Sequence, residues 1–307
     1  MRLLHCACAS PLLIDGAANV TLPAVPSRAD LRFLDEAARE LLPVDPTPSL
    51  DEIAASPSVA HMGEPTLAPQ HPAERLRVVV SGSDAALAAV LTRMMRADYL
   101  WAEVAYIPLD PTSAAAAVWG VAGLARAELM DAAVEAEVAP SPCIRTDRSE
   151  VIAGSATLSN IDPGKEYVGE IVVDSAVLLF REDSGESGRF HGSFGARVVP
   201  MNTAPGIAAT RLVTPLSSGG RRGRRSPEEL ERLSRLPLGG WLTRRAGVAP
   251  GQVDPGSVLT GRAVQSGGVG IRVSIDGVER PRPVDRVTFY RHLRDLQSVN
   301  LSPVATV

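Results

Sequence analysis

The sequence predicts an α/β domain followed by an antiparallel β-sandwich-like domain. Two observations support this fold class. A strand–turn–helix pattern occurs twice between residues 76 and 118, and short β-branched segments bounded by Gly, Pro, Asp or Ser dominate after residue 140. We place the first domain at residues 1–135, with residues 9–74 partly irregular. The second domain then covers residues 136–307 and includes a basic loop and short helix at residues 217–236.

The first strand–turn–helix unit is the clearest element of the chain. The continuous apolar run Leu76–Val80 is typical of a strand that is buried on both faces of a parallel sheet. Residues 81–84 form a turn, and the spacing predicts a helix over Ala85–Ala97. The apolar stripe of this helix consists of Leu87, Val90, Leu91 and Met94.

A second unit follows, with a strand at Val104–Leu109, a turn at Asp110–Ser113 and a short helix over Ala114–Val118. Nearer the N-terminus we expect a buried strand at Leu3–Cys8. A helix opens at residues 27–30, continues with apolar residues at helical spacing to Leu41, and ends before Pro43.

The β-rich half is predicted from its short apolar segments, and one helix interrupts it. That helix begins at Ser226, which is followed by Pro227 and Glu229, and it extends to about Leu236. The expected strands are Glu150–Ala156, Tyr167–Val173, Val177–Arg181, Ala196–Val199 and Gly270–Ile275.

Composition excludes several classes of protein. The net charge of −4 argues against a general nucleic-acid binder. Three cysteines give no disulfide framework and favour a reducing cytoplasm. No apolar run approaches the ~18–20 residues of a membrane span. Cys6 and Cys8 lack a second ligand pair, so we expect a buried strand there and no metal site.

The turn within Val78–Ala86 has two interpretations. Gly82 allows a close ligand approach, and the N-terminus of the following helix favours an anion, so the turn could cradle a phosphate. Any tight strand-to-helix turn, however, also favours a glycine and a Ser or Asp cap.

Three motifs in the sequence bear on the phosphate-binding interpretation. They are Gly82-Ser83-Asp84-Ala85-Ala86, Pro108-Leu109-Asp110-Pro111-Thr112-Ser113-Ala114, and Asp276-Gly277-Val278-Glu279. Their order resembles that of the diacylglycerol kinase and NAD kinase superfamily, in its bacterial lipid-kinase branch. In that family the motifs read Gly-Gly-Asp-Gly-Thr, Pro-Leu-Gly-Thr-x-Asn-Asp and Asp-Gly-Glu. The resemblance spans residues 75–120 and, more loosely, 150–300, and it implies the NAD kinase/diacylglycerol kinase-like fold.

The resemblance also implies roles for individual residues. Asp276 would accept the proton of the substrate hydroxyl, with Glu279 beside it as the second residue of the catalytic region. ATP, with Mg²⁺, would be the cofactor, and the chemistry would transfer its γ-phosphoryl group to a diacylglycerol-type hydroxyl. The matching nucleotide-binding positions are Gly82, Ser83, Asp84, Asp110, Thr112 and Ser113.

The departures from the family pattern favour a second hypothesis. Ser83, Ala85 and Ala86 replace two glycines and a threonine, and Asp110-Pro111 replaces Gly-Thr. Pro111 offers no backbone donor, and Asp110 would repel a phosphate unless a metal ion intervened. The chain is thus either a divergent lipid kinase or a non-catalytic, pseudokinase-like binding or regulatory protein that needs no cofactor. Asp276-Gly277 also has an ordinary alternative, a hairpin turn.

One basic loop, Arg221–Arg225, bears on the partners of the protein. It could contact lipid phosphates at a membrane surface or an acidic partner, although most such runs of charge form a solvated loop. The sequence leaves the oligomeric state open, a homo-oligomer included.

Overall fold

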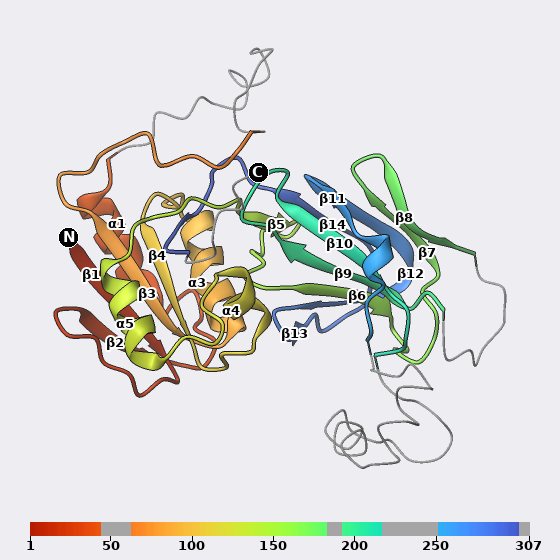
Figure 1. Cartoon of the computed structure of the whole chain (residues 1–307), viewed down its shortest axis with the longest axis horizontal. Helices are drawn as coiled ribbons and strands as arrows, with labels where there is room; N and C mark the ends of the chain where they lie inside the picture. Colours follow the sequence, from red (N-terminus) through yellow and green to blue (C-terminus); the bar gives the residue numbers. More distant parts are fainter. Residues whose placement is uncertain (44–62, 183–191, 217–250, 301–307) are drawn as a thin grey trace.

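Two sheets form the protein, and they lie side by side along the long axis of the molecule (Figure 1). The computed structural model describes residues 1–43, 63–182, 192–216 and 251–300. Within these ranges the first sheet has five strands in the order β15-β4-β3-β1-β2, and each neighbouring pair is parallel. The second sheet has ten antiparallel strands. The predicted fold class, an α/β part followed by an antiparallel β part, is therefore confirmed.

The parallel part contains most of the described helices. In chain order its elements are β1 (Arg2–Cys8), β2 (Ala18–Leu22), α1 (Arg32–Leu41), β3 (Leu76–Gly82), α3 (Asp84–Arg96), β4 (Glu103–Pro108), α4 (Ala114–Val118), α5 (Arg126–Glu135) and, from the end of the chain, β15 (Gln297–Ser298).

Strand β3 lies at the centre of this sheet, between β1 and β4. Its Val78–Val80 run is completely buried, as expected for a strand covered on both faces. The predicted stripe of α3 is confirmed, because Leu87, Val90, Leu91 and Met94 are all completely buried. These side chains belong to one continuous core with β1 and β4.

The first helix starts later than the sequence predicts. Ser27 was expected to open it, but α1 begins at Arg32 with Leu31 as its N-cap. The backbone N–H and the hydroxyl of Ser27 both donate to the carboxylate of Asp30, at 2.8 and 2.7 Å. This local pairing forms a turn before the helix, because Ser and Asp side chains compete with helical hydrogen bonds.

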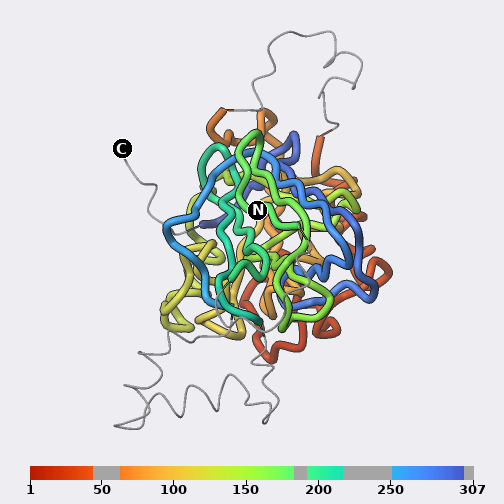
Figure 2. The backbone as a smooth tube through the Cα atoms, turned by 90° about the vertical axis from the view of Figure 1, so that its right-hand side faces the viewer, coloured from red at the N-terminus to blue at the C-terminus, as the bar shows by residue number. Residues whose placement is uncertain are grey.

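The antiparallel part is organised around one long strand, β12. Residues 264–268 of β12 pair with β7, residues 271–275 pair with β6, and β14 lies along its other edge. Figure 2 shows this part in front of the parallel part. Its elements are β5 (Ile144–Thr146), β6 (Ala156–Asn160), β7 (Gly169–Val173), β8 (Ala176–Arg181), β9 (Gly195–Pro200), β10 (Ile207–Leu212), the 3₁₀ turn η2 (Pro255–Ser257), β11 (Leu259–Gly261), β12 (Ala263–Ile275), β13 (Val278–Glu279) and β14 (Val284–Arg291).

One expected strand is wrong. Residues 150–155 form a loop with a single isolated bridge, and β6 begins only at Ala156. Strands β7, β8 and β9 match the prediction to within two residues, and β12 begins seven residues earlier than expected. The predicted helix from Ser226 and the Arg221–Arg225 loop lie outside the described residues.

The end of the chain returns to the first sheet. Gln297 and Ser298 of β15 pair with Glu103 and Val104 of β4, so the parallel sheet includes residues from beyond the predicted boundary at 135. The division into residues 1–135 and 136–307 stays a prediction. Among the described residues, no helix has the length and apolar character needed to cross a membrane.

Candidate functional site

The first motif lies where β3 ends and α3 begins. Ser83 is the N-cap of α3, and its hydroxyl accepts the N–H of Ala86 at 3.3 Å. A Cβ at Gly82 would lie 2.9 Å from the Cβ atoms of both Cys8 and Ala86. Gly82 is therefore needed so that β1 and α3 can pack closely. This differs from the expectation that the missing side chain makes room for a ligand, because protein atoms occupy that space.

Asp84 binds groups from the next strand and helix. Its Oδ1 accepts the hydroxyl of Tyr106 at 2.9 Å, and its Oδ2 accepts the N–H of Ala115 at 3.0 Å. Tyr106 also donates to the carbonyl of Gly82, at 3.2 Å. Burial, together with the nearby charge of Asp84, raises the pKa of the Tyr106 phenol. Asp84 thus connects the turn after β3 with β4 and α4.

The second motif forms a self-contained turn. Oδ1 of the exposed Asp110 accepts the hydroxyl and the N–H of Thr112, at 2.7 and 2.8 Å. These two bonds lower the pKa of Asp110. Ser113 is the N-cap of the short helix α4 and accepts the N–H of Ala116 at 3.1 Å. The polar side chains of this turn therefore satisfy one another or the backbone.

The third motif is a hairpin turn, as one interpretation predicted. Asp276 and Gly277 have φ values of 49° and 82° and join β12 to β13, where Ile275 pairs with Val278. Positive φ at both central residues is the geometry for which Asp-Gly is favoured in two-residue hairpins. The turn directs the Asp276 side chain toward the loop at residues 150–155, where it is 8% exposed.

Three successive backbone N–H groups bind the Asp276 carboxylate. Oδ2 accepts the N–H of Ala153 at 2.8 Å, and Oδ1 accepts those of Gly154 and Ser155 at 2.8 and 2.9 Å. The N–H of Asp276 donates in return to the carbonyl of Ser155, at 2.8 Å. Such a run of N–H groups is a typical cradle for an anion. Here the anion is a side chain of the protein.

The Asp84 and Asp276 contacts meet at one point. A Cβ at Gly154 would lie 2.3 Å from the backbone nitrogen of Ala115, the group that donates to Asp84. Gly154 itself donates to Asp276. We call Asp84, Tyr106, Asp276 and the backbone at residues 115 and 153–155 the carboxylate cluster. It joins the carboxyl ends of β3 and β4 to the β12–β13 hairpin.

Electrostatics within the carboxylate cluster favour one protonated carboxyl group. Burial raises the pKa of Asp276 to about 7, the three N–H donors oppose this rise, and the charge of Asp84 adds to it. A carboxylate surrounded by protein and close to a second carboxylate binds a proton more readily than one in water.

The remaining predicted residues lie outside the carboxylate cluster. Glu279 is exposed and pairs with Arg272 at 3.3 Å. Asp110 and Thr112 bind each other. Of the predicted site residues, the structure thus brings together Asp84, Asp276 and Ser113, whose side chain hydrogen-bonds with Tyr106, and it connects Gly82 through its carbonyl.

Sequence reasoning missed the partners of these carboxylates. Tyr106 lies inside a predicted strand. Aromatic residues make up only 4% of the sequence, and this rarity is the one signal that could have drawn attention to Tyr106. Residues 153–155 were assigned to a strand, although the Gly154-Ser155 pair is a turn signal that could have found the loop.

ATP with Mg²⁺ fits this arrangement poorly. The N–H groups of residues 153–155 bind the Asp276 carboxylate. The backbone N–H of Ala115, at the start of α4, binds Asp84. Among the described residues, no group of three or more His, Cys, Asp or Glu side chains is arranged to hold a metal ion. Asp276, with its pKa of about 7, can exchange a proton near neutral pH.

Comparisons with known proteins complete this description. No protein-family model matches the sequence. No curated protein matches it significantly.

Several solved structures are similar to the chain. A diacylglycerol kinase from Bacillus anthracis strain Sterne aligns over 100% of this chain and 98% of its own, with 8% identity and a TM-score of 0.49. An NAD kinase from Archaeoglobus fulgidus in complex with ATP aligns over 72% of this chain and 76% of its own, with 12% identity and a TM-score of 0.37. Yeast NADH kinase complexed with NADH aligns over 72% of this chain and 60% of its own, with 12% identity and a TM-score of 0.32. The chain is thus similar to diacylglycerol kinase and NAD kinase structures, as its motifs predict, at low sequence identity.

Proposed function

We propose that the protein is a non-catalytic binding protein that retains a kinase-like architecture. The observation that carries this proposal is the set of three N–H bonds from residues 153–155 to the carboxylate of Asp276. Phosphoryl transfer depends on donors and a metal ion that neutralise the charge of the transferring group. In this chain the three donors next to Asp276, the residue that the resemblance assigns as catalytic, are bound to its carboxylate.

The sequence departures support the same proposal. Ala85 and Ala86 replace the glycine and threonine of the first family motif, and Pro111 replaces the threonine of the Gly-Thr pair in the second. Asp110 adds a negative charge on an exposed turn. Ala86 and Pro111 each lack a hydroxyl that could donate to a nucleotide phosphate, Ala85 adds a Cβ where the family motif has none, and Asp110 would repel a phosphate.

The test is a phosphoryl-transfer assay. Purified protein is incubated with Mg²⁺, labelled ATP and mixed diacylglycerols, and labelled phosphatidic acid is measured beside an active diacylglycerol kinase. We expect no product above background and no rise in the midpoint of thermal unfolding with ATP. Product formation that Asp276→Asn abolishes would overturn the proposal.

A second candidate function, lipid phosphorylation, is favoured by one observation. Asp276 has a pKa of about 7 and lies close to Asp84. A general base works best when its pKa is near the operating pH. If this candidate is correct, the assay gives product whose rate rises with pH through about 7, and Asp84→Asn lowers that rate as well.

A further inference from the structure

The outer face of the antiparallel part carries large apolar side chains that no described element covers. Phe180 is 64% exposed, Val177 is 56% exposed and Val269 is 74% exposed. Phe180 and Val177 belong to β8, which lies at the end of the molecule away from the parallel part (Figure 1), and Val269 belongs to β12. Exposed apolar side chains that gather on one face are typical of an interaction surface.

A β-bulge in β8 explains why two of these side chains point outward. The register between β7 and β8 shifts by one residue at Leu178. Because a bulge allows two consecutive side chains to point to the same side, Leu178 and Leu179 are both buried, at 6% and 3% exposure. Val177 and Phe180, which flank this pair, therefore both lie on the outer face.

The strand register places two opposite charges on the same face. Glu170 of β7 lies opposite Phe180 on one side and opposite Gly267 of β12 on the other. Gly267 in turn lies opposite Arg286 of β14. The four residues form one row across the sheet, in which the backbones of Glu170 and Arg286 are two strand spacings, about 10 Å, apart.

Both charged side chains of this row are exposed, and neither has a hydrogen-bond or ion-pair partner among the described residues. Between them the surface is open, because a Cβ at Gly267 would meet nothing within 4 Å. Elsewhere on β12 the charge of Arg272 is used, since it pairs with Glu279 at 3.3 Å. The row therefore offers one acidic and one basic group on either side of a glycine.

We propose that this face binds a second copy of the chain about a twofold axis that passes over Gly267 along the direction of the strands. Such an axis exchanges the two sides of the row, so that Glu170 faces Arg286 of the partner subunit at both ends. Gly267 faces its own counterpart, where the missing side chains allow the two sheets to approach. Phe180 lies next to Glu170, so its ring also meets the arriving guanidinium group.

Charge complementarity is the reason to assign a second copy to this face. An anionic lipid surface or a nucleic acid would attract Arg286 but would be repelled by Glu170 in the middle of the face. A second copy supplies both opposite charges at the same spacing. The dimer does not depend on the proposed function, because a kinase and a binding protein could use it equally.

The experiment is sedimentation equilibrium of the full-length protein between ~1 and ~200 μM. Four strands offer less contact than a standard interface, so we expect a dissociation constant on the order of 10 μM. Glu170→Arg and Arg286→Glu each place like charges opposite each other at both ends of the row. Each variant should weaken the dimer about thirtyfold. The double variant restores opposite charges, and the original dissociation constant should return.

Two further variants test the location of the interface. Glu36→Arg, on the exposed face of α1, changes the net charge as much as Glu170→Arg does and should leave the dimer unchanged. Phe180→Ser removes the exposed ring beside Glu170 and should weaken the dimer about tenfold. Since a second substitution does not rescue an unfolded variant, recovery in the double variant separates lost pairing from lost folding.

The proposal is overturned if the original protein stays monomeric at the highest concentration. It is equally overturned if the double variant dissociates as readily as the single variants, or if Glu36→Arg weakens the dimer as much as Glu170→Arg. If Phe180→Ser weakens the dimer and the charge reversals do not, the copies associate in another arrangement and the twofold axis proposed here is wrong.

Discussion

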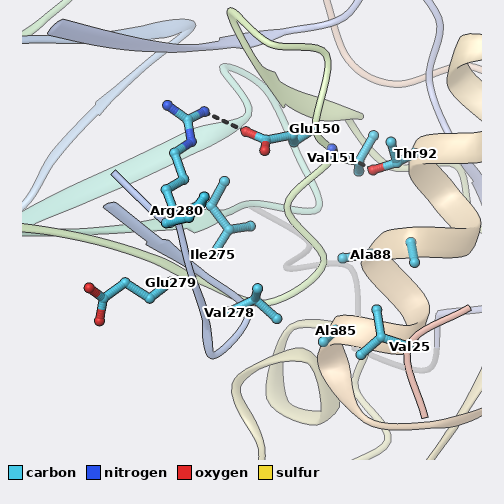
Figure 3. Close-up of a pocket in the computed structure, with 12 residues that line it drawn as sticks. Val25, Ala85, Ala88, Thr92, Glu150, Val151, Ile275, Val278, Glu279 and Arg280 are labelled. Carbon is cyan, nitrogen blue, oxygen red and sulfur yellow. Dashed lines mark hydrogen bonds and ion pairs between the residues drawn. The ribbon is translucent and has the colours of Figure 1, made fainter. Parts of the chain in front are cut away.

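The carboxylate cluster and the cavity between α3 and the β12–β13 hairpin differ in how completely protein atoms fill them. In the carboxylate cluster, both carboxylates accept hydrogen bonds from backbone or tyrosine donors, and Gly154 lies against the backbone of Ala115. Between α3 and the β12–β13 hairpin, short side chains leave about 270 Å³ unfilled, and this cavity is lined in part by Ala85, Val278 and Glu279 (Figure 3). The motif residues Asp84 and Asp276 are thus held by internal bonds, while other residues of the same motifs border open space. Motif positions alone therefore do not show where the molecule has room for a ligand.

The largest expected effect is a pH dependence of the free energy of unfolding, caused by Asp276. Its pKa is about 7 in the folded protein, against ~3.9 for an unfolded chain. Between these values the folded state holds a proton that the unfolded state lacks, so this residue makes the protein less stable as pH rises from ~4 to ~7. The total loss is about 4 kcal/mol, with no further change above that range.

The measurement is the free energy of urea unfolding at several pH values, for the original protein and for Asp276→Asn. The difference in free energy of unfolding between the original protein and the variant should fall by this amount as pH rises, because the variant cannot titrate at this position. His292, whose pKa burial and the charge of Arg145 lower to about 4, gives a trend of opposite sign in both proteins and cancels. A difference that does not change with pH would contradict the prediction.

The second effect concerns the contact between the loop at residues 153–155 and α4. Gly154→Ala places a Cβ 2.3 Å from the nitrogen of Ala115, so backbone must move and the bonds to Asp84 and Asp276 must lengthen. We expect a loss of about 3 kcal/mol in the free energy of unfolding, measured by urea denaturation. Gly267→Ala is the matched control, because its Cβ would meet nothing within 4 Å. Equal stability of the two variants would show that the carboxylate cluster is looser than described.

The smallest of these effects tests Tyr106. Tyr106→Phe removes the hydroxyl that donates to Asp84 and to the carbonyl of Gly82. We expect a loss of about 2 kcal/mol in the free energy of unfolding, because the half-buried Asp84 carboxylate and the carbonyl of Gly82 lose a donor. The control is Tyr290→Phe. The contact of Tyr290 is made by its ring, whose centre lies 4.5 Å from the guanidinium carbon of Arg145, and phenylalanine retains that ring. If Tyr290→Phe lowered the free energy of unfolding as much as Tyr106→Phe, the hydrogen bond to Asp84 would not explain the loss.

Much of the parallel part could be predicted because its pattern is local. The Val78–Val80 run and the spacing of α3 each contain enough apolar residues in one window to define the element. Ser113 as the cap of α4 and Asp276-Gly277 as a hairpin turn follow from local backbone chemistry in the same way.

The partners of the carboxylates could not be predicted, because they depend on contacts between distant segments. No local pattern indicates that Asp276 meets residues 153–155, or that Tyr106 reaches Asp84. The apolar residues Val151 and Ile152 have the composition of a strand. The backbone N–H groups that follow them, however, donate to the Asp276 side chain and not to a neighbouring strand. The cavity was also beyond prediction, since small residues on a helix face can as easily indicate close packing.

The pairing of Gln297 and Ser298 with β4 has a consequence for synthesis of the protein. The parallel sheet cannot be completed until residue 298 has left the ribosome, although four of its five strands are made by residue 108. Before that, the outer edge of β4 is exposed, and an unpaired strand edge is a site of aggregation. The nascent chain therefore leaves the Glu103–Val104 part of this edge without its strand partner for most of its translation, and we expect a chain truncated before residue 297 to aggregate more readily than the full-length protein.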